Sequence, residues 1–231
     1  MLAREVEGRV GGRQLTWNCP LSAMKWDFLK ADTAPRLPPS ARAVVIMAAI
    51  GAITGLISSI PSPLPEIRLD EDGFLLNAEG VPLHAGIAFG AGIGFSMWLW
   101  VTRDLGRCFL TMAVVLIGWL AAVNTANDMY QALVGSELFG TVPGAKANRE
   151  VLGLLLGGIG GGAVGAGLTA FGTGIPAEPI RRTKSWILVV VVGTALGALL
   201  YPAADLNALP LLFIPWQALV AAAVAFGLTR A

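Results

Sequence analysis

Residues 153–174 read GLLLGGIGGGAVGAGLTAFGTG, and this stretch decides the fold. It holds ten glycines and no charged residue. In water, each glycine inside a helix costs about 1 kcal/mol relative to alanine. In a bilayer, a backbone group that leaves the helix finds no water to bind, so the helix is kept despite its glycines. The stretch therefore predicts a buried transmembrane helix that neighbouring helices approach closely.

Glycines recur at every fourth position of this segment, at Gly153, Gly157, Gly161 and Gly165. An earlier apolar segment has the same step, at Gly86, Gly90 and Gly94. Residues four apart share one face of a helix, so each set forms a row without side chains. We expect both rows to be helix-packing surfaces. The shared pattern indicates either an internal repeat or the ordinary packing of membrane helices.

Composition places the chain among membrane proteins. Hydrophobic residues make up 55% of the sequence and charged residues 13%, with a net charge of +1. Soluble domains carry about 25% charged residues. The sequence therefore predicts an all-α protein whose main partner is the lipid bilayer, and it gives no sign of nucleic-acid binding.

Six apolar segments have about the 20 residues needed to cross the hydrocarbon core of a bilayer. They cover residues 42–60, 84–102, 108–127, 150–173, 185–202 and 208–229. The predicted fold of residues 42–231 is a six-transmembrane-helix bundle with glycine-striped helices.

Residues 1–41 are more polar and are predicted to form a cytoplasmic N-terminal tail. Its apolar residues at helical spacing are Trp17, Leu21, Met24 and Phe28. They favour a short helix on the membrane surface, and a tail without fixed structure is the alternative. Met24 is also an alternative start, which would leave residues 1–23 outside the natural protein.

Basic residues gather between the predicted spans on one side of the membrane. They are Arg36, Arg42, Arg103, Arg107, Arg181, Arg182, Lys184 and Arg230. Loops rich in Lys and Arg remain in the cytoplasm. We therefore predict a multi-pass protein of a bacterial-type inner membrane with both termini in the cytoplasm.

The predicted outer loop at residues 61–83 is acidic and has turn signals at Asp72-Gly73 and Glu79-Gly80. Apolar residues separate the two signals, which favours a small extracytoplasmic β-hairpin-like loop. The same acids fit part of a calcium loop, but Arg68 occupies the first ligand position. A loop that docks a partner is the third interpretation.

Four polar residues are candidates for a solute pathway. Asn124, Asn127 and Asp128 share one face at the end of the third span, where they line a pathway or simply meet water. Gln217 lies in the sixth span after Pro215. It either faces a pathway or makes a structural hydrogen bond, to the backbone freed by the proline or across helices.

Catalytic, cofactor and metal sites are not predicted. The middle of each predicted span lacks Asp, Glu, Lys, Arg and His, the residues that mark ion-coupled carriers. A single histidine and two cysteines are too few for most metal sites. Cys19 and Cys108 both fall on the predicted cytoplasmic side, so we expect no disulfide. We therefore expect a non-enzymatic packing or accessory subunit that associates with itself or with another membrane protein. The alternative is a small channel or facilitator for a neutral or weakly polar solute.

Overall fold

The computed structural model describes residues 40–69, 73–78, 80–135 and 145–230, which are mostly helical. The described residues include six helices that are long and apolar enough to cross a membrane. The tail helix predicted within residues 1–39 lies outside the described residues. So do Asp70, Asp72 and Glu79, the acids of the calcium interpretation.

The long helices are separated by short connections. They are α1 (Ser40–Ser58), α2 (Leu83–Trp100), α3 (Leu105–Val134), α4 (Ala145–Gly174), α6 (Thr183–Gly197) and α8 (Pro210–Thr229). One turn, α5 (Glu178–Arg181), connects α4 to α6, and α7 (Leu200–Asp205) connects α6 to α8.

Two helix ends differ from the predicted spans. Helix α3 continues to Val134 instead of ending near residue 127, because residues 128–134 contain no Gly or Pro to stop it. The fifth span breaks after Gly197 and resumes as α7. Pro202 explains this break, since it has no N–H for the carbonyl of Ala198 and its ring crowds that carbonyl.

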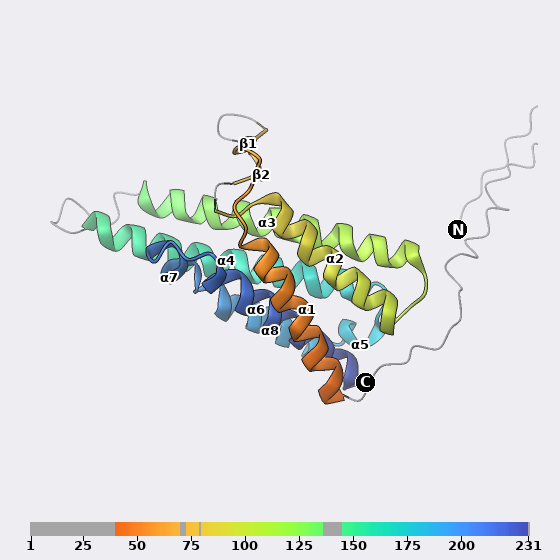
Figure 1. Cartoon of the computed structure of the whole chain (residues 1–231). Helices are drawn as coiled ribbons and strands as arrows, with labels where there is room; N and C mark the ends of the chain where they lie inside the picture. The colour runs from red at the N-terminus through yellow and green to blue at the C-terminus, as the bar shows by residue number, and fades with distance from the viewer. Residues whose placement is uncertain (1–39, 70–72, 79, 136–144, 231) are drawn as a thin grey trace, which may run out of the picture.

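The helices pack in a closed circuit, in the order α1, α2, α3, α4, α6, α8 and back to α1. Figure 1 shows α3 and α4 side by side, with α8 ending near the start of α1. The strands β1 and β2 lie where α1 ends and α2 begins. We call this the hairpin end of the bundle.

Helix α4 packs against α3 through the predicted glycine row. A Cβ atom at Gly157 would lie 2.6 Å from the carbonyl oxygen of Ala126, and one at Gly161 would lie 2.6 Å from that of Ala122. Gly153 faces the ring of Tyr130 in the same way. Glycine is therefore required here for the close approach of the two backbones.

A second set of glycines on α4 faces α6. A Cβ at Gly158 would collide with the backbone of Gly197, and one at Gly162 with that of Gly193. Helix α4 thus presents glycine to both of its neighbours.

Glycines also lie at the close helix–helix contacts made by α1 and α2. Gly86, Gly90 and Gly94 of α2 face α3, where a Cβ at Gly90 would lie 3.0 Å from the carbonyl oxygen of Met112. Gly51 and Gly55 of α1 lie against the backbone of α8.

Many large apolar side chains are exposed on the surface of the bundle. Val45, Ile53, Phe109 and Phe171 are each at least 60% exposed. Large apolar side chains gathered on a surface mark contact with a membrane or a partner. Together with the six apolar helices, they define a multi-pass membrane protein.

The predicted hairpin is present as a two-stranded antiparallel sheet. Strand β1 (Ile67–Arg68) pairs with β2 (Leu75–Asn77), with an irregularity between the two residues of β1. After β2, Ala78 and Val81 form an isolated β-bridge, and Gly80 has a φ of +81°. A positive φ at this position suits glycine, which has no Cβ to clash.

Candidate functional site

A cavity of about 410 Å³ opens at the hairpin end. Its walls come from the hairpin, α3, α4, α7 and α8, together with Gly197 at the end of α6. Gly158, Gly161 and Gly162 form part of the α4 wall. Because these residues lack side chains, the cavity reaches the backbone of α4.

Aromatic rings close the cavity in the middle of the bundle. Trp119 of α3 and Trp216 and Phe213 of α8 all line it and are at least 93% buried, with exposures of 7%, 7% and 1%. The Trp119 ring centroid lies 5.4 Å from that of Phe213 and 6.4 Å from that of Trp216. Behind them, Phe89 of α2 packs edge-on against Trp216 at 5.5 Å. We call Trp119, Phe213 and Trp216 the aromatic floor.

Trp216 is held in place by a hydrogen bond in addition to its packing. Its indole Nε1 donates to the carbonyl oxygen of Gly193 on α6, at 3.0 Å. The backbone of Gly193 lies in the close α4–α6 contact. Glycine packing and the position of the floor are therefore linked.

Polar groups gather at the rim of the cavity. The exposed side chains of Glu66 and Arg68 form an ion pair with an Nε–Oε1 distance of 2.6 Å. Asn127, Tyr130 and Asn207 complete the polar part of the lining. Among the described lining residues, titratable groups therefore occur at the mouth and not at the floor.

Asn207 also explains how α7 reaches the rim. It has a φ of +50°, a conformation that Asn tolerates better than most residues. The N–H of Ala208 bonds the carbonyl of Ala203 at 2.8 Å, and the N–H of Asn207 bonds that of Ala204 at 3.2 Å. This bonding pattern ends a helix with a left-handed residue, and it directs the chain from α7 into α8.

Asn124 attaches the hairpin to α3. Its Oδ1 accepts from the backbone N–H of Leu75 at 2.7 Å, and its Nδ2 donates to the Leu75 carbonyl at 3.0 Å. The amide thus pairs with Leu75 as a neighbouring strand would. Since Leu75 lines the cavity, Asn124 fixes one of its walls.

Asn77 holds the other side of the hairpin from inside. It is 2% exposed. Its Nδ2 donates to the carbonyls of Leu64 and Pro65, and its Oδ1 accepts from the N–H of Leu83, the first residue of α2. This side chain therefore joins the hairpin to both ends of its loop.

The four pathway candidates occupy different places. Asn127 lines the cavity, while Asn124 supports the hairpin behind it. Asp128 is exposed and is not among the lining residues. Gln217 is fully buried, and its Nε2 donates to Ser58 Oγ of α1 at 2.8 Å. The structure thus places Asn127 on the cavity wall, Asn124 behind the hairpin wall and Gln217 behind the floor.

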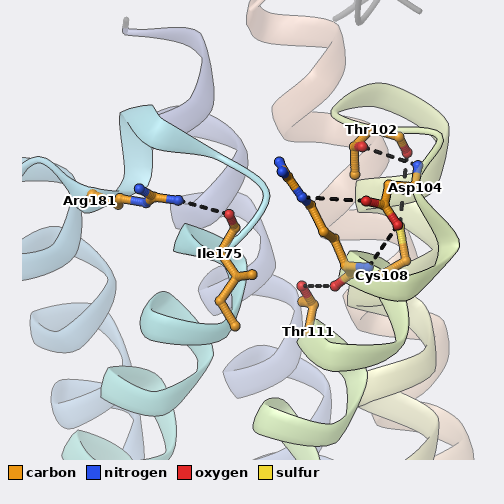
Figure 2. A network of polar contacts seen from close by, with 7 residues as sticks. Thr102, Asp104, Cys108, Thr111, Ile175 and Arg181 are labelled. Atoms are coloured by element: carbon orange, nitrogen blue, oxygen red, sulfur yellow. Dashed lines mark hydrogen bonds and ion pairs between the residues drawn. The ribbon is translucent and has the colours of Figure 1, made fainter. Parts of the chain in front are cut away.

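A second set of polar contacts, drawn in Figure 2, lies around the start of α3 and the end of α4, which Figure 1 shows at the end opposite the hairpin. Asp104 Oδ1 accepts from the N–H of Arg107 at 3.2 Å and caps α3. Its Oδ2 lies 3.4 Å from Arg107 Nε, as an ion pair without hydrogen-bond geometry. Thr111 Oγ1 donates to the carbonyl of Gly172 at 3.0 Å and joins α3 to α4.

Arg181 stabilises the end of α4 in the same region. Its Nε donates to the carbonyl of Gly174 at 2.6 Å. Its Nη2 donates to the carbonyl of Ile175 at 2.9 Å (Figure 2). Positive charge at a helix C-terminus is favourable because it opposes the helix dipole. These contacts make the network a support for helix ends.

Removing the Asp104 cap should destabilise the protein modestly. We expect Asp104→Ala to lower the free energy of unfolding by about 1 kcal/mol, the usual value of an N-cap. Asp104→Ser keeps a capping oxygen and should stay close to the wild type. Thermal unfolding of both variants in the same detergent checks this, and equal losses in the two would argue against the cap.

No protein-family model, curated protein or solved structure matches the chain. Among the described residues, no group of three or more His, Cys, Asp or Glu side chains is placed to hold a metal ion. The candidate site is therefore described by the residues that line its cavity.

Sequence reasoning did not identify the aromatic floor or Asn77. Trp119 and Trp216 stand out as tryptophans inside predicted spans, away from the ends where such residues usually lie. That position was the available signal. It does not reveal that α3 and α8 bring the two rings together.

Proposed function

We propose that the chain is a small facilitator for a neutral or weakly polar solute, which enters the cavity from the hairpin end. The cavity supports this proposal, because it has mainly apolar walls, a polar rim and an aromatic floor. Binding sites for small molecules have volumes of about 300–1,000 Å³ and this same composition. The paired charges of Glu66 and Arg68 at the mouth favour an uncharged solute.

The aromatic floor closes the path in this conformation. Below it lie buried apolar side chains such as Ile93, Val115 and Val220. A solute that crosses the membrane therefore requires movement of the floor. The cavity behind the polar rim would act as a binding chamber, and the aromatic floor would act as its gate.

An accessory subunit of a homo- or hetero-oligomeric complex is the alternative role. It was favoured by the glycine rows, which would let a partner helix approach closely. In this chain the rows meet its own helices, since Gly157 and Gly161 face α3, and Gly158 and Gly162 face α6. We propose that they pack the bundle itself, which leaves them covered and removes the main reason for an assembly role.

We also propose that the hairpin end faces outward from a bacterial-type inner membrane. Asp104 and Arg107 at the start of α3, and Arg181 of α5, lie at the opposite end of the bundle. Other basic residues follow α2 and α5 in the chain, namely Arg103, Arg182 and Lys184. The excess of Lys and Arg at that end favours the cytoplasm.

Blocking the mouth should abolish facilitated flux. Ala204 is exposed on α7 and lines the cavity, so Ala204→Trp places a large ring there without disturbing the core. We expect glycerol and urea flux into proteoliposomes, followed by stopped-flow light scattering, to fall to the level of protein-free liposomes. The matched control is Leu206→Trp, because Leu206 is 66% exposed and does not line the cavity.

The control variant should retain the wild-type flux. Wild-type flux no faster than that of protein-free liposomes, for glycerol, urea and larger neutral solutes, would contradict the facilitator. Equal flux in Ala204→Trp and the wild type would show that the cavity is not the path.

A further inference from the structure

Two buried polar atoms beside the aromatic floor lack a hydrogen-bond partner within the described residues. They are Nε1 of Trp119 and Oε1 of Gln217. Trp119 is 7% exposed and Gln217 is fully buried. Buried polar groups in folded proteins nearly always have a partner. Two such atoms from helices that meet at the floor therefore point to a ligand.

Both side chains lie beside the first turn of α2, Gln217 through Ser58 of α1 and Trp119 by direct contact. The Gln217 amide donates to Ser58 Oγ at 2.8 Å, and Ser58 Oγ lies 3.5 Å from the carbonyl oxygen of Ala85. The next residue, Gly86, faces Trp119. A Cβ there would come within 2.7 Å of Trp119 Cδ1, the atom bonded to Nε1.

We call this turn of α2, which contains Ala85 and Gly86, the polar turn. The aromatic floor separates the polar turn from the cavity by one layer of rings. Phe213 packs on Trp119, and it lies one helical turn from Gln217 on the same face of α8. Trp119 itself lines the cavity. A solute at the floor is thus next to the Trp119 ring, and the polar turn lies directly behind.

The two atoms together require a neutral group that both accepts and donates a hydrogen bond. An indole N–H can only donate, and an amide oxygen can only accept. A hydroxyl group accepts and donates through one oxygen, so a single hydroxyl is chemically able to pair with both atoms, whereas an ether oxygen pairs only with Trp119. A carboxylate or an ammonium ion would satisfy one atom and leave a charge buried.

We propose that Trp119 Nε1 and Gln217 Oε1 form a site for one hydroxyl group of the solute, directly behind the aromatic floor. This inference rests on the proposed function and narrows its solute class to neutral hydroxylated molecules. The apolar cavity would receive the carbon skeleton, and the polar turn would select the hydroxyl.

Indole N–H signals test the site directly. The protein has seven tryptophans, and Trp119→Phe identifies the Trp119 signal in a ¹⁵N–¹H spectrum of the labelled full chain in nanodiscs. The probe is ethylene glycol, and 1,2-dimethoxyethane serves as a control that accepts but cannot donate. The Trp216 signal is an internal control because its N–H already bonds Gly193 at 3.0 Å.

We expect ethylene glycol to shift the Trp119 signal saturably and the dimethyl ether to shift it far less. Gln217→Leu should weaken the apparent binding by about fivefold to tenfold, as the loss of one hydrogen bond implies. Trp186→Phe, at a 40% exposed position on α6, should bind as the wild type does. If Gln217→Leu fails to fold, the comparison of ethylene glycol with 1,2-dimethoxyethane on the wild-type protein still tests the site.

Three results would overturn the site: a Trp119 signal that ignores the glycol, an equal response to the ether, or an equal shift of Trp216. An unchanged Trp119 signal would mean that the glycol does not bind at this turn. Flux measurements separate this inference from the proposed function. Glycol binding without flux would retain the site and reject the facilitator, and flux without a Trp119 shift would do the reverse.

Discussion

Replacing Gly161 with leucine should leave almost no correctly folded protein in the membrane. A Cβ at this position would lie 2.6 Å from the Ala122 carbonyl oxygen and 3.1 Å from Ala126 Cβ. Both obstacles belong to α3, one of them in its backbone, so a rotamer change cannot relieve the clash. Helices α3 and α4 would have to separate, which would open the cavity wall and the floor. Even Gly161→Ala should cost about 1–3 kcal/mol by overpacking.

Gly167→Ala is the matched control on the same helix. A Cβ there would lie 3.7 Å from Trp186 and 3.9 Å from Val190, which is ordinary contact. We expect no loss, and a gain of up to about 1 kcal/mol from the better helix propensity of alanine. Fluorescence-detected size exclusion after heating measures both variants. A monodisperse, heat-stable Gly161→Leu protein would refute the requirement for close backbone packing.

The positions of the spans were predictable because hydropathy and bilayer thickness determine them with little help from tertiary contacts. The residues at which the helices end were less predictable. The break in the fifth span follows from Pro202 and was readable in outline. The extension of α3 to Val134 was not, because a polar sequence after an apolar span is compatible with either loop or helix.

The glycine rows show where sequence periodicity stops being informative. The four-residue step identified Gly157 and Gly161 as one face, and the structure places α3 against it. The spacing alone does not name the neighbour. It also gave no warning that Gly158 and Gly162 face α6 on another side of the same helix. The same four-residue spacing of glycines is expected whether the row packs against a partner protein or against another helix of this chain.

The cavity required three-dimensional information. Trp119 and Trp216 are distant in the sequence, and only the packing of α3 and α8 into one bundle brings their rings to 6.4 Å. The hairpin was predictable from its turn residues, and its small antiparallel sheet is confirmed. Its attachment through Asn124 was not, since an Asn at a helix end meets water more often than a strand.

Replacing Asn124 with leucine should release the hairpin from α3. The variant loses both bonds to Leu75, which is 3% exposed, so a buried N–H and carbonyl remain unpaired. Such groups cost about 1–3 kcal/mol each. Asn77 still holds the base of the hairpin, so the helices should remain folded. We therefore expect a local opening, which trypsin should report as faster cleavage after the exposed Arg68.

Two further variants distinguish the attachment from a general change of polarity. Asn124→Asp keeps an acceptor for the Leu75 N–H and loses the donor to its carbonyl, so its cleavage rate should be intermediate. Asn127→Leu changes a lining residue one turn away and should cleave at the wild-type rate. Unchanged cleavage after Arg68 in Asn124→Leu would show that the hairpin is held by other contacts. Faster cleavage would identify the Asn124 amide as the link between α3 and the hairpin wall of the cavity.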